Sequence, residues 1–348
     1  MFEQRSKRTE VSSLGEFGLI ERLTKNVKII NKSTIKGIGD DAAVIDNGNK
    51  RTLVSTDLLV EGVHFDLSYV PLKHLGYKAA IVNISDMAAM NAQPKQLLAA
   101  FAVSNKYSVE ALDEIYSGLL AACQKYKVDL VGGDTTSSNA GMFISITIIG
   151  EADESDIVYR KGAQEEDLIC VTGDLGGAYM GLQLLRREQA VFLADPNMQP
   201  DLYGFDYILE RQLKPEARTD MIAKFKELDV KPTAMIDISD GLASEVIHIC
   251  RQSDTGCKIY EDKIPIDQQT YDTARQFNLD PTTCAMNGGE DYELLFTISF
   301  SDYEKIRNHP DITVIGQITN ADSGYTLIAK NNTKHPITAQ GWDALIKK

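Results

Sequence analysis

The stretch Gly37-Ile38-Gly39-Asp40-Asp41-Ala42-Ala43-Val44-Ile45 decides how this chain is interpreted. Its two glycines free the backbone, two adjacent aspartates follow, and a short apolar segment leads away. Carboxylates this close repel each other unless a cation lies between them. The same order, an apolar run that ends in aspartate, recurs along the chain at Asp57, Asp86, Asp134, Asp237 and Asp240. This recurrence predicts one divided site for several hard cations.

Size and charge limit the classes of function. A chain of 348 residues exceeds one typical domain, so we expect two. The net charge of −14 makes nucleic acid and anionic membranes poor partners, and phosphate groups should be bound through metal ions. No apolar run approaches the ~20 residues of a membrane span, and residues 1–8 lack the apolar core of a signal peptide. The five cysteines include no Cys-x-x-Cys pair, which favours free thiols in a reducing cytoplasm.

Hydrophobic periodicity predicts an α/β (α+β) fold with two domains and mixed sheets flanked by helices. We expect a polar arm at 1–13, an N-terminal domain at 14–152 and a C-terminal domain at 153–348, because the chain turns polar and charged around 151–166. Helices are expected at 15–25, 75–90, 108–126, 176–187, 201–212, 216–228, 241–252 and 267–277. Strands are expected at 42–46, 52–57, 97–103, 128–131, 142–150, 168–173, 234–238, 257–261, 292–298 and 312–318.

The aspartates are short oxygen ligands of the kind that Mg²⁺ prefers. Ser55 and Thr56 can add hydroxyl or carbonyl oxygens beside Asp57. A single aspartate before a helix is more often an N-cap, and Asp240-Gly241 also fits that role. The recurrence of the pattern favours metal binding, and an EF-hand is excluded because no alternating acidic loop is closed by a glutamate.

A phosphate site is indicated by Gly132-Gly133-Asp134-Thr135-Thr136, where bare backbone beside a carboxylate lets phosphate oxygens approach main-chain N–H groups. It is not a Walker loop, because the Gly-Lys-Ser/Thr ending is missing, and protein-kinase signatures are absent as well. Arg160 is a candidate phosphate clamp, although a solvated arginine fits the composition equally well. Glu290 lies in what would ordinarily be an acidic turn, and the isolated His64 and Trp342 would not be singled out on composition alone.

Taken together, the motifs resemble those of the thiamine-monophosphate kinase family, within the aminoimidazole ribonucleotide synthetase-like superfamily. The matching segments follow the family's order and cover nearly the whole chain from 15 to 342. They are GEFGLIERL (15–23), GIGDDAAV (37–44), VSTDLLVEGVHF (54–65), GYKAAIVNISDMAAMNAQP (76–94), VGGDTT (131–136), RKGA (160–163), VTGDLGGA (171–178), IDISDGLASE (236–245) and GGEDYELLFT (288–297).

The resemblance implies a two-domain subunit that dimerises through its N-terminal sheet, with ATP and several Mg²⁺ ions in a cleft between the domains. The metal ligands that it implies are Asp41, Ser55, Thr56, Asp57, Asp86, Asp134, Asp237 and Asp240. The ATP contacts that it implies are Gly133, Asp134, Arg160 and Ser239. Thiamine monophosphate would be contacted by His64, Glu290 and Trp342.

The implied reaction moves the γ-phosphoryl group of ATP onto the phosphate of thiamine monophosphate, giving thiamine diphosphate and ADP. The acceptor is anionic, so no side-chain general base is expected. The obstacle is repulsion between two polyanions, which bound cations relieve while they align the reacting groups for in-line attack. This reaction fits an acidic protein with many carboxylates at its site.

Two other interpretations stay open. An aminoimidazole ribonucleotide synthetase-like ATP-dependent ligase is disfavoured by the GGEDYELLFT segment and by Trp342. A non-enzymatic divalent-metal-binding protein would need no nucleotide site, and Gly133 and Arg160 argue against it.

Two relatives within the superfamily are disfavoured by missing cysteines. Selenophosphate synthetase would need a reactive cysteine near the N-terminus, but residues 1–36 contain none. A hydrogenase-maturation relative should end in a functional cysteine, which the tail lacks.

Overall fold

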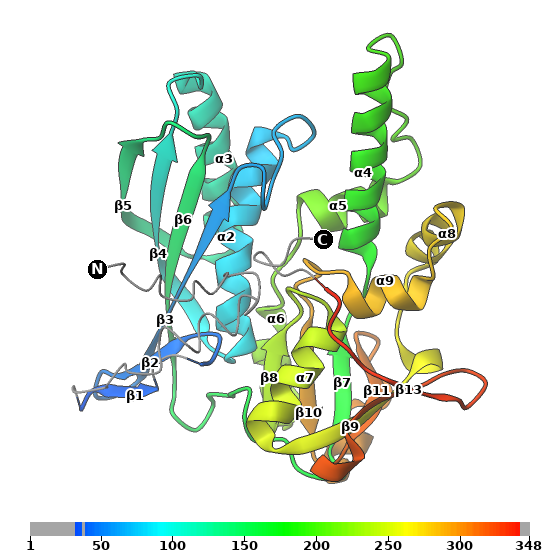
Figure 1. Ribbon diagram of the computed structural model, residues 1–348. Coiled ribbons are helices and arrows are strands. Elements are labelled where there is room, and N and C mark those ends of the chain that lie inside the picture. The colour runs from blue at the N-terminus through cyan, green and yellow to red at the C-terminus, as the bar shows by residue number, and fades with distance from the viewer. Residues whose placement is uncertain (1–31, 37–38, 342–348) are drawn as a thin grey trace, which may run out of the picture.

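The computed structural model describes residues 32–36 and 39–341, and it contains one β-sheet in each half of the chain (Figure 1). The expected arm at 1–13, the expected helix at 15–25 and Trp342 lie outside the described residues. None of the helices within the described ranges is long and apolar enough to cross a membrane. The predicted α/β fold, with mixed sheets flanked by helices, is confirmed.

The first sheet has six strands in the order β1-β2-β3-β6-β4-β5. They are β1 (Thr34–Lys36), β2 (Ala43–Asp46), β3 (Arg51–Val60), β4 (Gln93–Val103), β5 (Asp129–Ser137) and β6 (Phe143–Ala152). Strands β4 and β5 pair in parallel, and the other neighbours are antiparallel. Strand β5 therefore forms one edge of this sheet, three strand positions away from β3.

Two long helices of the first half cross each other at close range beside this sheet. They are α2 (Leu72–Ala89) and α3 (Val109–Tyr126). Each presents a glycine at the crossing: a Cβ on Gly76 would lie 1.8 Å from the carbonyl oxygen of Ile115, and a Cβ on Gly118 would lie 1.8 Å from that of Lys73. No side chain larger than hydrogen fits at either position without a shift of the backbone. The crossing therefore fixes α2 in place.

The second sheet has seven strands in the order β13-β12-β9-β11-β7-β10-β8. They are β7 (Leu168–Thr172), β8 (Ala234–Asp237), β9 (Thr255–Tyr260), β10 (Leu294–Ile298), β11 (Ile312–Asn320), β12 (Tyr325–Ile328) and β13 (Lys334–Pro336). Strands β9 and β12 pair in parallel, and the other neighbours are antiparallel. The helices of this half are α4 (Gly177–Ala194), α5 (Asp206–Leu213), α6 (Asp220–Glu227), α7 (Leu242–Ser253), α8 (Gln268–Gln276), α9 (Pro281–Asn287) and α10 (Tyr303–Ile306).

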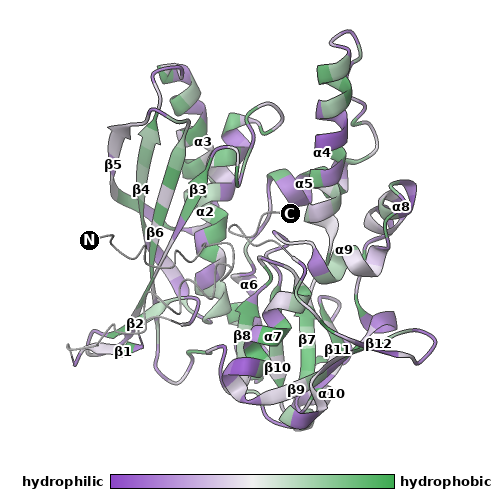
Figure 2. Cartoon of the chain, viewed as in Figure 1, coloured by the Kyte–Doolittle hydropathy of each residue, from purple (hydrophilic) through white to green (hydrophobic). Residues whose placement is uncertain are grey.

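Helix α2 belongs to the cores of both halves. Ile81 and Ile84 pack in the core of the first sheet, whereas Ala88 and Ala89 pack in a core that includes Met235 of the second half. Figure 2 shows apolar residues gathered on the central strands of both sheets. Thirteen of the 18 residues of α2 are buried, and these include the polar Lys78 and Ser85. Residues on α2 can therefore contact either half of the molecule.

Most expected helices and strands are present close to their expected bounds, and the differences have identifiable causes. Helix α9 was not predicted, although Asp280 caps it by accepting the N–H of Thr283 over 2.9 Å, and Pro281 follows at the first position. Strands β1, β12 and β13 were not predicted either. The last two form a hairpin that joins the sheet because β12 pairs with β9, which a local pattern does not show.

Candidate active site

Three of the predicted metal ligands meet in one acidic cluster, which consists of Asp41, Asp86 and Asp237. One carboxylate oxygen from each residue lies within 4.8 Å of the other two. Asp41 precedes β2, Asp86 lies on α2, and Asp237 is the last residue of β8. Asp57, on β3, is close enough to raise the pKa of both Asp86 and Asp237. The fold thus gathers carboxylates from four separate elements.

Two serine hydroxyls orient the carboxylates of the acidic cluster. Ser85 Oγ donates to Oδ2 of Asp237 over 2.6 Å, and Ser55 Oγ donates to Oδ2 of Asp86 over 2.5 Å. The first of these bonds is buried and runs from α2 in one half of the chain to β8 in the other. The geometry of the cluster therefore depends on the position of α2 between the two sheets.

The electrostatics of the acidic cluster favour a bound cation. Burial raises the pKa of Asp237 to about 8, and the neighbouring Asp41 adds to the rise. Burial also raises the pKa of Asp86 well above its usual value, with further contributions from Asp57 and Asp237. Both causes penalise the charged form of the carboxyl group. A hard divalent cation among these oxygens would offset both penalties, so the residues fit a Mg²⁺ centre.

Arg160, the predicted phosphate clamp, pairs with the acidic cluster. Its Nε and Nη2 donate to Oδ2 and Oδ1 of Asp41 over 2.8 and 2.7 Å, and its backbone N–H donates to Oδ1 of Asp40 over 3.2 Å. Burial by itself would lower the pKa of Arg160, but Asp41 and Asp40 raise it above its usual value. The guanidinium group is thus the counter-ion of a predicted metal ligand.

The loop before α7 carries Ser239 and Asp240, and a residue that the sequence analysis did not single out fixes its backbone. Oε1 of the buried Glu245 accepts the N–H of Asp240 over 2.8 Å and that of Ser239 over 3.3 Å. Gly241 has a φ of 115°, and a Cβ there would lie 3.0 Å from the backbone of Asn287. Glu245 lies in the first turn of α7, so its side chain ties the preceding loop to the start of this helix.

His64 and Glu290, predicted to contact the acceptor, come from opposite halves of the chain and lie near Lys78. Nδ1 of His64 accepts the backbone N–H of Val60 over 2.9 Å, so the neutral ring carries its proton on Nε2. Burial lowers the pKa of His64; the negative charge of Glu290 opposes this, and the positive charge of Lys78 adds to it. A neutral imidazole therefore lies beside a carboxylate that comes from the other half of the chain.

Comparison with known proteins identifies the family. The family model described as AIR synthase related protein, N-terminal domain, matches residues 39–152. The thiamine-monophosphate kinase of Bacillus subtilis (strain 168) is 32% identical over 336 residues, which are 95% of this chain and 99% of that protein. The thiamine-monophosphate kinase of Aquifex aeolicus (strain VF5) is 34% identical over 310 residues, which are 88% of this chain and 92% of that protein. This chain belongs to the thiamine-monophosphate kinase family.

Solved structures extend the family relationship to the whole fold. The structure described as AaThiL complexed with AMPPCP and TMP has a TM-score of 0.83 and 31% identity to this chain, and covers 97% of this chain and 99% of its own. A thiamine monophosphate kinase from Aquifex aeolicus has a TM-score of 0.74 and 30% identity, and covers 92% of this chain and 98% of its own. The family predicted from the motifs is confirmed.

In this member of the thiamine-monophosphate kinase family, Gly133 and Asp134 lie away from the acidic cluster. Both are exposed on β5, at the edge of the first sheet. Asp134 is aligned across the sheet with Ala100 on β4, Ser145 on β6 and Leu58 on β3. Neighbouring strands are about 4.8 Å apart, so three steps place Asp134 about 14 Å from β3. Within its own chain, Asp134 therefore lies three strand positions away from the strand that carries Asp57.

The hydroxyl group of Thr56 also faces away from the acidic cluster. Side chains alternate along a strand, so Thr56 points to the face of β3 opposite to that of Ser55 and Asp57. Thr56 is exposed, and its Oγ1 donates to the carbonyl oxygen of Ile146 over 2.8 Å. Thr56 was expected to offer a metal either its hydroxyl or its backbone carbonyl oxygen. The hydroxyl group is used in a hydrogen bond within the sheet.

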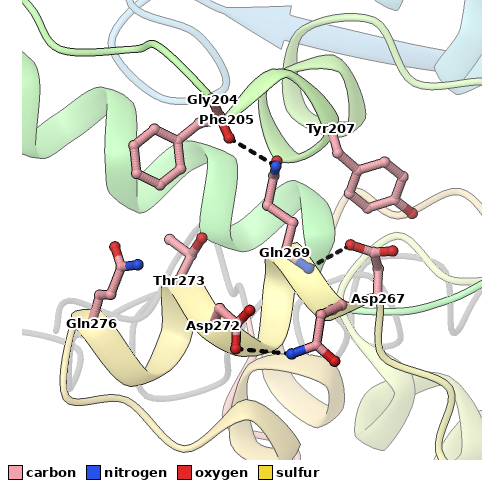
Figure 3. A pocket seen from close by; sticks show the side chains of 9 residues that line it. Gly204, Phe205, Tyr207, Asp267, Gln269, Asp272, Thr273 and Gln276 are labelled. Carbon is pink, nitrogen blue, oxygen red and sulfur yellow. Dashed lines mark hydrogen bonds between the residues drawn. The ribbon is translucent and has the colours of Figure 1, made fainter.

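A surface pocket of about 580 Å³ in the second half contains none of these site residues (Figure 3). It lies between the start of α5 and helix α8. Asp267 caps α8 by accepting the N–H of Gln269 over 2.7 Å, and Nε2 of Gln269 donates to the carbonyl oxygen of Gly204 over 2.9 Å. These bonds give Asp267 and Gln269 structural roles in the fold.

Proposed function

We propose that this chain transfers the γ-phosphoryl group of ATP to thiamine monophosphate, forming thiamine diphosphate and ADP. The observation that carries the proposal is the similarity, over 97% of the chain, to a structure that holds AMPPCP and TMP. AMPPCP is an ATP analogue, so the two ligands correspond to the donor and the acceptor of this reaction. The acidic cluster of Asp41, Asp86 and Asp237 adds the cation-binding chemistry that the transfer needs.

We further propose that Mg²⁺ is the cation, because the cluster offers hard oxygen ligands at short mutual distances. When bound, Mg²⁺ supplies charge neutralisation and alignment for two phosphate groups that otherwise repel each other. The proposed ligands from one chain are Asp41, Ser55, the backbone of Thr56, Asp57, Asp86, Asp237 and Asp240. The hydroxyl groups of Ser85 and Ser55 hold two of these carboxylates in place before any cation arrives.

The remaining site residues divide between the two substrates. We assign Arg160 and Ser239 to ATP, and His64, Glu290 and Trp342 to thiamine monophosphate. The phosphate of the acceptor is already anionic, so the chain needs no general base to activate it. The neutral His64 and the carboxylate of Glu290 suit the polar thiamine end of the acceptor, whereas the carboxylate cluster suits cations that hold its phosphate end.

We propose that the active form is a homodimer and that the chain divides into an N-terminal domain at 14–152 and a C-terminal domain at 153–348, preceded by an arm at 1–13. The position of β5 supports the dimer: Gly133 and Asp134 are exposed at a sheet edge, about 14 Å from β3 of their own chain. A second copy could place its own β5 against the cleft of the first. The two ATP residues would then come from the partner chain.

A coupled assay that detects ADP tests the proposed function. Purified protein with ATP and Mg²⁺ should phosphorylate thiamine monophosphate, and chromatography should show thiamine diphosphate as the product. Free thiamine should be a very poor acceptor, because its hydroxyl group would need a base that the site does not offer. Faster turnover of thiamine than of thiamine monophosphate would contradict the proposal, and so would full activity in the presence of excess EDTA.

A further inference from the structure

A network of hydrogen bonds around Glu290 joins the two halves of the chain. Lys78, on α2, is only 7% exposed, and its Nζ lies 2.8 Å from Oε1 of Glu290. The same Nζ donates to the backbone carbonyl oxygen of Gln212, on α5, over 3.0 Å. Nε2 of Gln212 in turn donates to Oε2 of Glu290 over 2.9 Å. Each oxygen of the Glu290 carboxylate thus has its own donor, which fixes the orientation of the group.

Stability alone does not account for this network. Burying the ammonium group of Lys78 costs hydration that an apolar side chain of similar size would not lose. Gln212 is also buried, and its Oε1 has no hydrogen-bond partner among the residues that the structure describes. A buried amide oxygen without a donor is costly. Residues that weaken the fold in this way are expected where they serve binding or catalysis.

The backbone of Glu290 is held as firmly as its side chain. Its φ of 68° lies in the left-handed region, which is uncommon for residues other than glycine. Its N–H donates to the carbonyl oxygen of Ser239 over 2.7 Å, and a Cβ on the preceding Gly289 would lie 2.3 Å from the same oxygen. The loop of Glu290 therefore lies directly on the loop of Ser239, so Lys78 and Gln212 connect the acceptor end of the site to the ATP end.

We propose that Lys78 and Gln212 are positioning residues for the acceptor: they hold Glu290 so that its remaining lone pairs receive N–H donors from the aminopyrimidine of thiamine monophosphate. This inference rests on the proposed function. A carboxylate accepts up to about four hydrogen bonds, and Lys78 and Gln212 use two. The side chain of Glu290 is 29% exposed, so the other lone pairs are open to a ligand. Because the open lone pairs of Glu290 are acceptors, a ligand that pairs with them brings N–H groups.

The test measures kcat and both KM values for the wild type and three single variants. Lys78→Met should raise the KM for thiamine monophosphate about tenfold, the effect of losing one oriented contact, and leave the KM for ATP within about twofold. Lys78→Arg should recover part of the loss. Gln212→Leu should raise the same KM with a melting temperature at or above that of the wild type, because an unpaired buried oxygen is removed.

Tyr77→Phe is the matched control. Tyr77 precedes Lys78 on α2, is buried, and donates from its hydroxyl group to Oε2 of Glu216 in the other half over 2.9 Å. Loss of this bond removes a contact between the halves without touching Glu290. Both KM values should therefore stay within about twofold of the wild type, and a rise of the acceptor KM as large as that of Lys78→Met would overturn the inference.

A double variant decides whether Lys78 acts through Glu290. Lys78→Met combined with Glu290→Gln should have the acceptor KM of Glu290→Gln alone, because the first change then has nothing left to position. If the effects of the two changes on the acceptor KM multiply, Lys78 is a structural link between the halves. The same conclusion follows if the KM for ATP rises as much as that for the acceptor. If the wild type is inactive with thiamine monophosphate, the proposed function fails; if it is active and the Lys78→Met and Gln212→Leu variants match it, only this inference fails.

Discussion

Replacing Arg160 by methionine should destabilise the metal-free protein and make its stability depend on Mg²⁺. The guanidinium group of Arg160 donates two hydrogen bonds to Asp41. The side chain of Asp41 is 1% exposed and that of Arg160 is 18% exposed. Methionine keeps most of the aliphatic stem and removes the charge. Asp41 would then stay buried beside Asp86 and Asp237 without its counter-ion.

The size of the effect follows from this burial. Removing one partner of a buried ion pair costs about 3–5 kcal/mol. Water reaches part of the Arg160 side chain, so we expect a cost somewhat below that range, about 2–4 kcal/mol. At roughly 2 °C per kcal/mol for a chain of this size, the melting temperature in EDTA should fall by about 4–8 °C. In saturating Mg²⁺ the cations replace the missing positive charge, so at least half of this loss should be recovered.

Thermal melts followed by circular dichroism, with EDTA and with Mg²⁺, measure both quantities. Arg51→Met is the matched control, because Arg51 also pairs with two carboxylates, but those of Asp46 and Glu154 are largely open to solvent. Its cost should be below about 1 kcal/mol and independent of Mg²⁺. A wild-type melting temperature for Arg160→Met in EDTA, or an equal loss with and without Mg²⁺, would refute the reasoning.

Three further predictions concern single residues. Asp86→Asn should lower turnover by orders of magnitude at saturating Mg²⁺ while the fold survives; near-normal turnover in the coupled assay would contradict the proposed metal centre. Burial raises the pKa of Asp291 to about 7 from an ordinary 3.8, so the folded protein favours the neutral, protonated carboxyl group. The contribution of this protonation to stability is complete below about pH 4 and is lost as the pH rises through about 7. Melting temperatures of the wild type should therefore fall relative to those of Asp291→Asn between pH 5 and pH 8, and parallel curves would show that Asp291 does not titrate there. Trp342→Ala should raise the KM for thiamine monophosphate about 5- to 30-fold with little change for ATP, as expected for a lost stacking contact on a cationic ring. Unchanged KM values with a lower melting temperature would make Trp342 structural.

The sequence by itself determined the family, the fold class and most helices and strands. These features are local: apolar periodicity, glycines beside aspartates, and aspartates at the ends of apolar runs can all be read within a window of a few residues. Asp41, Asp86 and Asp237 were predicted as ligands in this way, and the structure brings their carboxylate oxygens within 4.8 Å of one another. The cap at Asp280 was also a local signal, and closer attention to capping patterns would have found it.

Only the tertiary structure decided which of these residues share a site. The bond from Ser85 to Asp237 spans 152 positions and that from Lys78 to Gln212 spans 134, so no local pattern relates the partners. The exposed place of Asp134 follows from a strand order that sets β6 and β4 between β3 and β5. Strand order and the shared position of α2 depend on how the whole chain buries its apolar surface. Local propensity therefore specifies each element, and packing between distant elements specifies what its side chains meet.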